Sequence, residues 1–163
     1  MHAKLPLLVG AVFLGGVLAA VTPHASAYPD KPIDLIIPYA PGGSIDILGR
    51  VMQPLLASEL GKPVVVQNMG GAGGALGTAA AARAQPDGHT FVITTNAVLT
   101  ISPHVQKNLG FDPQKDFAPV SLVATGPMAI GVSGASGITT LQQLVDRGRS
   151  GKNLTYATPG VGS

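Results

Sequence analysis

The chain contains no cysteine among its 163 residues. This absence excludes disulfides and thiol chemistry, and it removes the usual soft metal ligands. Charge is scarce as well, because Asp, Glu, Lys and Arg together make up 11% of the residues. No run or face gathers Lys and Arg, so the charge pattern gives no support to nucleic-acid binding. We therefore expect a fold stabilised by packing alone, with no metal, no cofactor and no nucleic-acid partner.

The first 27 residues have the pattern of a secretory signal peptide. Lys4 precedes an apolar run from Leu5 to Val21, and Ala25-Ser26-Ala27 supplies an A-x-A cleavage site. A retained membrane anchor is the alternative, but the small residues favour removal. We predict cleavage between Ala27 and Tyr28 and a periplasmic location. The remaining chain carries nine basic and eight acidic residues, a net charge of +1.

A glycine-containing loop joins the first predicted strand to the first predicted helix. Residues 33–37 form a short β-branched run, and apolar residues at helical spacing follow from Leu48 to Leu56. Between them, Gly42 and Gly43 have no side chains to obstruct a ligand. The start of the helix directs unpaired N–H groups and a partial positive charge at the same place. We predict that this opening loop, Pro38 to Asp46, binds a carboxylate or a phosphate.

Two residues at this helix start have two interpretations each. Ser44 fits an N-cap, and Asp46 lies in the first turn, where negative charge is favourable to the helix dipole. One interpretation is capping alone and the other is direct ligand contact, and the sequence favours neither. Further along, Pro54 predicts a kink near Arg50, and Gly61 is expected to end the helix.

A second glycine-rich connection, residues 68–77, follows a predicted strand at 62–67. It fails both nucleotide-binding templates, because a Rossmann fingerprint from Gly71 would need glycine at Leu76, and a P-loop would need lysine at Gly77. We interpret the connection as a tight turn into an alanine-rich helix whose small residues allow close helix-on-sheet contact.

The alternation of strands and helices predicts the fold class. A helix at 76–84 is followed by a turn and a third strand at 90–95, with Asn96 at its carboxyl end. Three such units indicate an α/β fold with a largely parallel sheet, and such sheets bind ligands at the carboxyl ends of their strands. The opening loop and Asn96 would therefore lie at one edge.

Beyond Asn96 the pattern is looser. We expect a short helix from Ser102-Pro103 to about Asn108, a surface turn, three more strands, and a helix that begins with a capping box in Thr139 to Gln142. The turn is placed at 110–117 and the strands at 119–124, 128–132 and 154–157. The sequence closes with a Gly/Ser loop, Thr158 to Ser163, at the carboxyl end of the last predicted strand.

In this order and spacing, the motifs resemble the Bug family, the substrate-binding proteins of tripartite tricarboxylate transporters. The resemblance covers residues 28–163. Its markers are Tyr28-Pro29-Asp30-Lys31-Pro32-Ile33, Pro38-Tyr39-Ala40-Pro41-Gly42-Gly43 with Asp46 and Arg50, Val65-Val66-Gln67-Asn68 with Gly71-Ala72-Gly73-Gly74, Pro86-Asp87-Gly88, Asp116-Phe117-Ala118-Pro119-Val120, and Tyr156-Ala157-Thr158 with Gly160-Val161-Gly162-Ser163.

The resemblance implies a periplasmic-binding-protein-like receptor of two lobes, each with a central sheet flanked by helices. The first lobe would span 28–98 and the second 99–163, incomplete here because family members continue further. The two glycine-rich loops would close on a small di- or tricarboxylate, with Asp46 organising the first loop. Ligand contact would come from Tyr39, Ala40, Gly42, Gly43, Ser44 and Asn96, and from Thr158, Gly160, Val161 and Ser163.

The same resemblance implies a monomeric receptor that delivers its ligand to an inner-membrane permease. A periplasmic receptor that signals to a membrane sensor kinase is the alternative, and the sequence does not separate the two.

A serine hydrolase is a weaker alternative. It would use Ser44 as the nucleophile and His89 or His104 as the base, but the G-x-S-x-G elbow is absent and serine at a helix start is more often a cap. We interpret both histidines as solvated surface residues and expect no catalysis. No two histidines have the spacing of a metal site.

Overall fold

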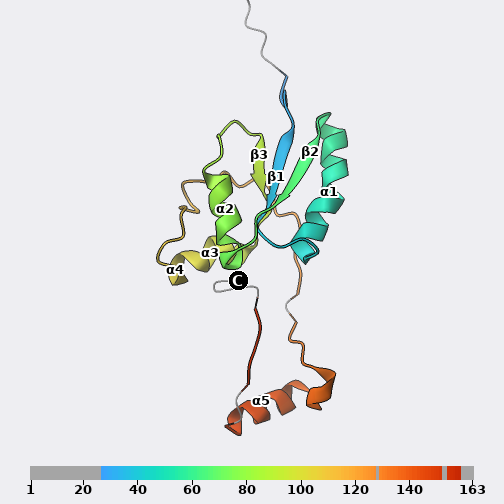
Figure 1. Ribbon diagram of the computed structural model, residues 1–163, viewed down its shortest axis with the longest axis vertical. Helices are drawn as coiled ribbons and strands as arrows, with labels where there is room; N and C mark the ends of the chain where they lie inside the picture. Colours follow the sequence, from blue (N-terminus) through green and yellow to red (C-terminus); the bar gives the residue numbers. More distant parts are fainter. Residues whose placement is uncertain (1–26, 128, 152–153, 159–163) are drawn as a thin grey trace, which may run out of the picture.

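A three-stranded parallel sheet lies at the centre of the protein, in the order β2-β1-β3. The computed structural model describes residues 27–127, 129–151 and 154–158. Helices α1 and α2 flank the sheet (Figure 1), which confirms the predicted α/β class. The strands are β1 (Ile33–Ile37), β2 (Val64–Asn68) and β3 (Thr90–Val92), and the two helices are α1 (Ser44–Leu60) and α2 (Ala75–Ala82).

The core forms where β1 meets α1. Ile33, Leu35 and Ile37, on one face of β1, are each at most 3% exposed, as expected for the middle strand of a sheet covered on that face. The apolar stripe of α1 lies against them and includes Ile45, Leu48, Met52, Leu56 and Leu60. Of the five residues that define the predicted helical spacing, Leu48, Met52 and Leu56 lie on this face, whereas Val51 and Leu55 are 60% and 64% exposed, so the spacing identified the buried face only in part.

Helix α1 ends where the sequence predicts. Gly61 adopts a left-handed conformation, with φ of +64°, directly after Leu60, which is the usual C-terminal glycine. Pro54 lies inside the helix without ending it, and the kink near Arg50 stays a prediction.

Helix α2 approaches β1 closely because small residues face the sheet. A Cβ added to Gly77 would lie 2.5 Å from the backbone oxygen of Met69 and 2.8 Å from Cα of Pro38. No side chain fits at that distance, so glycine is required for this contact. The second glycine-rich connection, with the short 3-10 helix η1 (Ala72–Gly74) inside it, is thus a tight turn into a helix, as predicted.

The segment after β3 begins as expected. The ladder continues one residue past β3, where Ile93 N donates to Ile36 O at 3.1 Å. Short helices α3 (Asn96–Thr100) and α4 (Ser102–Val105) follow, so α4 ends earlier than the predicted limit at residue 108. The predicted turn at 110–117 is present, and Asp116 N donates to Asp112 O at 2.9 Å within it.

The later predicted strands are wrong in the described residues. Residues 119–127, 129–132 and 154–157 contain no strand; residue 128 lies outside the described ranges. Val120, Leu122 and Ile130 are 79%, 80% and 75% exposed. A strand needs a neighbour for its backbone hydrogen bonds and apolar side chains. These segments have the composition of strands without a partner in the described part of the chain.

A short 3-10 helix, η2 (Gly134–Ser136), and a final helix, α5 (Leu141–Arg149), close the described structure. Thr140 and Gln143 form the capping box of α5, one residue later than the sequence suggested. None of its residues is buried, and Leu141, on the predicted apolar face, is 66% exposed.

Across the described ranges, the helices are all too short or too polar to cross a membrane.

Candidate ligand-binding site

The strand order identifies the region of the sheet where a ligand is expected. The chain moves from β1 outward to β2 and then back past β1 to β3. Right-handed crossovers place α1 and α2 on opposite faces of the sheet when the direction reverses in this way. The reversal makes the space between the ends of β1 and β3 a topological switch point, where open α/β sheets bind their ligands.

The opening loop leaves β1 at this switch point. Ala40, Gly42, Gly43 and Ser44 are all exposed, and Gly42 has a φ of +84° that favours glycine. The N-cap of α1 is Gly43, with no capping side chain, so of the two interpretations of Ser44 the one as an N-cap is wrong. Ser44 is instead the first helical residue, and its N–H has no partner within the helix.

The buried side chain of Asp46 holds the opening loop in place through hydrogen bonds. It is 2% exposed, and its Oδ2 accepts a hydrogen bond from Gly42 N at 2.8 Å. Its Oδ1 accepts from Asn68 Nδ2 at 2.9 Å, and the same amide donates to Tyr39 O at 3.2 Å. Because Gly42 donates its N–H to Asp46, the free donors at the loop come from the helix start.

Arg50 completes this network one turn further along α1. Its Nε donates to Asp46 Oδ2 at 3.0 Å, and its Nη2 donates to Asn68 Oδ1 at 2.9 Å. The Arg50 hydrogen bond, followed by those from Gly42 and Asn68, lowers the pKa of the Asp46 carboxyl to about 2. The same carboxylate raises the pKa of Arg50. Both groups are therefore charged at neutral pH.

A second contact joins the loops after β1 and β3. Tyr39 Oη and Thr95 Oγ1 lie 2.7 Å apart and share a hydrogen bond. The Tyr39 hydroxyl also fills the space beside Gly74, where an added Cβ would lie 2.9 Å from it. Asn96 begins α3 directly after Thr95 and is exposed. The structure thus brings Asn96 and the opening loop to the same edge of the sheet.

The sequence also predicts ligand residues in the second lobe. Thr158 is exposed, and Gly160, Val161 and Ser163 lie outside the described residues.

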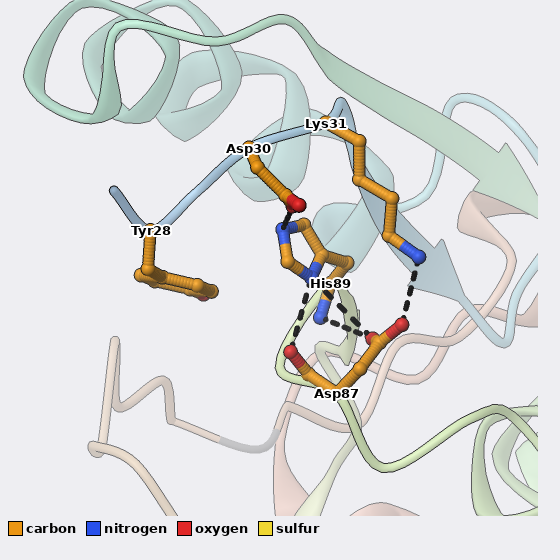
Figure 2. A pocket seen from close by; sticks show the side chains of 5 residues that line it. All are labelled: Tyr28, Asp30, Lys31, Asp87 and His89. Atoms are coloured by element: carbon orange, nitrogen blue, oxygen red, sulfur yellow. Dashed lines mark hydrogen bonds and ion pairs between the residues drawn. The ribbon is translucent and has the colours of Figure 1, made fainter. Parts of the chain in front are cut away.

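A second polar cluster, missed in the sequence, lies at the amino edge of the sheet (Figure 2). His89 is 8% exposed, so its interpretation as a solvated residue is wrong. Its Nε2 lies 3.1 Å from Asp30 Oδ1, and its ring meets Tyr28 edge to face at 5.1 Å between centroids. These residues, with Lys31 and Asp87, line a hollow of about 320 Å³.

The charged groups of this cluster are paired with one another. Lys31 Nζ donates to Asp87 Oδ2 at 2.7 Å, and His89 N donates to Asp87 Oδ1 at 3.0 Å. These bonds, led by that of Lys31, lower the pKa of Asp87 to about 2. The cluster fastens the segment before β1 to the turn before β3. In the sequence, the only signal for this cluster is the presence of polar residues in the two short segments 28–31 and 87–89.

The serine hydrolase geometry is not formed. Ser44 follows β1 and His89 precedes β3, and since the strands are parallel the two residues lie at opposite edges, separated by the length of β1, about 15 Å. His104 lines a different hollow, of about 560 Å³, with Lys107 and Asp112. Within the described ranges, no group of three His, Cys, Asp or Glu could hold a metal ion.

Comparison with known proteins identifies the family of this chain. Residues 48–163 match the sequence model described as the tripartite tricarboxylate transporter family receptor. Protein BugT of Bordetella pertussis is 33% identical over 160 residues, covering 96% of this chain and 49% of BugT. A UPF0065 protein of Bordetella bronchiseptica is 33% identical over 165 residues, covering 99% of this chain and 49% of that protein. The chain thus spans about half the length of these relatives.

Solved structures share the fold. A Rhodopseudomonas palustris protein with adipate is 28% identical, with a TM-score of 0.71 over 76% of this chain and 41% of the other. MatC from the same organism, with bound malate, is 34% identical, with a TM-score of 0.56 over 59% and 33%. The periplasmic binding protein BugD is 40% identical, with a TM-score of 0.54 over 56% and 30%. These likenesses confirm the predicted periplasmic-binding-protein-like fold.

Proposed function

The chain belongs to the tripartite tricarboxylate transporter receptor family, and on that premise we propose that it captures a small di- or tricarboxylate outside the cytoplasm for uptake by a transporter of this type. Members of this family are receptors. The ligand, the location and the partner of this chain are the proposal.

One observation carries the proposal: the start of α1 presents backbone N–H groups at the topological switch point. Gly43 caps the helix without a side chain, so the N–H groups of the first helical residues, Ser44 and Ile45, have no partner within the helix. The partial positive charge of the helix terminus acts at the same place. A carboxylate satisfies both the donors and the charge.

Each residue of the opening loop would have its own role in binding the ligand. Ser44 and Gly43 would donate N–H groups to the ligand, and Gly42 and Ala40 would leave space for it. Tyr39, through its hydrogen bond to Thr95, would hold the side of the site next to Asn96. In the proposed receptor these residues belong to a first lobe at 28–98. A second lobe from residue 99 would bring Thr158, Gly160, Val161 and Ser163 to the other side of the ligand. The solved relatives with malate and with adipate support a dicarboxylate as the first ligand to test.

The proposal includes a periplasmic location after cleavage between Ala27 and Tyr28, a monomeric receptor, and delivery to an inner-membrane permease. It assigns binding and no catalysis, which is consistent with the distance between Ser44 and His89.

Ser44→Pro tests the role of the helix-start N–H group. Proline suits the first helical position, and Gly43, with φ of −75° and ψ of 166°, already has the extended conformation that a residue before proline requires. The substitution therefore removes one donor while preserving the fold. We expect affinity for malate to fall by about tenfold, the value of one charge-assisted hydrogen bond.

The matched control is Ser44→Ala, which keeps the N–H group and removes only the hydroxyl. Affinities are measured from amide shifts in a malate titration of the full chain, with adipate as a second probe. Equal affinities for Ser44→Pro and wild type would exclude binding by this N–H group. A titration in which neither dicarboxylate shifts any amide of the wild-type chain would overturn the proposed function.

A further inference from the structure

A buried carboxylate beneath an anion-binding loop raises an electrostatic problem. Asp46 is 2% exposed, and it lies in the first turn of the helix whose start would hold the ligand. A carboxylate is the natural acceptor for Gly42 N–H, which fixes the loop. Its negative charge, however, opposes a second anion bound at the same loop.

Arg50 supplies the compensating charge. Among the described residues it is the charged side chain that contacts Asp46, while the other groups facing that carboxylate are neutral: Gly42 N–H from the loop and the Asn68 amide from the end of β2. Arg50 is also held in place, because its second contact is Asn68 Oδ1. The guanidinium therefore cannot turn away from Asp46 without losing two hydrogen bonds.

We infer that Arg50 is a positioning residue for the ligand: it neutralises Asp46, so that this carboxylate orders the loop without repelling a bound carboxylate. The inference rests on the proposed function for its ligand, and it adds a role for a side chain that does not touch that ligand. Asn68 supports this arrangement, because its side chain forms hydrogen bonds with Arg50, with Asp46 and with the Tyr39 carbonyl.

The low pKa of Asp46 agrees with this arrangement. The Arg50 hydrogen bond is the largest of the causes that lower it to about 2. Asp46 therefore remains ionised throughout the range in which a dicarboxylate ligand is itself ionised. The negative charge of Asp46 is therefore balanced by Arg50 and not removed by protonation.

A double-mutant cycle separates charge compensation from simple structural support. Arg50→Met leaves Asp46 charged and unpaired, and we expect affinity for malate to fall by about tenfold. Asp46→Asn in the Arg50→Met background removes that charge while keeping an acceptor for Gly42, and we expect affinity to return to within about threefold of wild type. Asp46→Asn alone replaces the oxygen that accepts from Asn68 with a donor, so its affinity measures the cost of that lost contact, which the cycle then subtracts. If Arg50 were only structural, the double variant would bind no better than Arg50→Met.

Lys31→Met provides the matched control. It removes a basic partner from Asp87, whose pKa is also about 2, but at the edge remote from the loop. We expect malate affinity to be unchanged in this variant.

A ligand-free measurement keeps the inference apart from the proposed function. Carboxyl NMR of the full chain follows the titration of Asp46, whose midpoint should rise from about 2 in Arg50→Met. A midpoint that does not move would overturn charge compensation even if malate binds. If neither malate nor adipate bound to wild type, the proposed function would be overturned, while this titration would still decide whether Arg50 compensates Asp46.

Discussion

The two edges of the sheet carry similar polar clusters in different states. At the carboxyl edge, Asp46 accepts the N–H of Gly42 and is paired with Arg50. At the amino edge, Asp87 accepts the N–H of His89 and is paired with Lys31. The pKa of each carboxyl is lowered to about 2. In both places one carboxylate orders a turn and one basic side chain balances it.

The difference lies in what the ordered turn leaves free. At the amino edge the turn is covered by the segment before β1, and Tyr28 Oη donates to Gly88 O at 2.6 Å. At the carboxyl edge the ordered loop leads into α1, whose first N–H groups have no partner within the helix. The same local chemistry therefore attaches two segments where the turn is covered, and in the proposed receptor it leaves N–H groups available for a ligand where a helix begins.

The largest expected effect comes from the backbone contacts that build each edge. Gly77→Ala places a Cβ 2.5 Å from the Met69 carbonyl oxygen, and we expect it to reduce the free energy of unfolding by about 3 kcal/mol. At the amino edge, Gly88 has a φ of +78°, and an added Cβ would meet only the Tyr28 ring, at 3.2 Å. We therefore expect Gly88→Ala to reduce the free energy of unfolding by about 1 kcal/mol. Urea unfolding measures both, and equal losses would contradict the closer packing assigned to the carboxyl edge.

Acid should weaken both edges over the same range of pH. The folded pKa values of Asp46 and Asp87 are about 2, below the ordinary value, so each ionised carboxylate contributes stability above about pH 4. That contribution is lost as the pH falls through about 2. The amide signals of Gly42 and His89, which donate to these carboxylates, should titrate together. A midpoint near 4 at either edge would show that its carboxylate is not paired in solution.

The smallest expected effect concerns the two tyrosine hydroxyls. Tyr39→Phe removes the half-buried hydrogen bond to Thr95 and should reduce the free energy of unfolding by about 1 kcal/mol. Tyr28→Phe removes the exposed bond to Gly88 O and should cost about 0.5 kcal/mol. Thermal unfolding of the two variants, compared under one buffer, checks the order; the reverse order would mean that the amino edge is the more tightly held.

Local sequence was sufficient for the unit from β1 to α1. The β-branched run, the glycines and the helical spacing lie within thirty residues of one another, so neighbouring residues determine the strand, the loop and the helix. They define the buried helix face only in part, since Val51 and Leu55 fit the spacing but are exposed. The position of Asn96 at the same edge also followed, because parallel strands align their carboxyl ends.

Contacts between distant segments could not be predicted in this way. Asn68 reaches Arg50 and Tyr39 only because β2 pairs with β1 in the register that places Asn68 opposite Ile37. His89 is buried by Tyr28 and Asp30, which lie about 60 positions earlier. The predicted strands at 119–132 have the composition of strands, but composition does not supply the partner that a strand requires.

The most direct measurement of the central claim is a malate titration of the full chain followed by amide NMR, read separately at the two edges. We expect saturable shifts at Gly43, Ser44 and Ile45, with the amides of Asp87 and His89 unmoved. Shifts confined to the amino edge, or no shift at the start of α1, would contradict it.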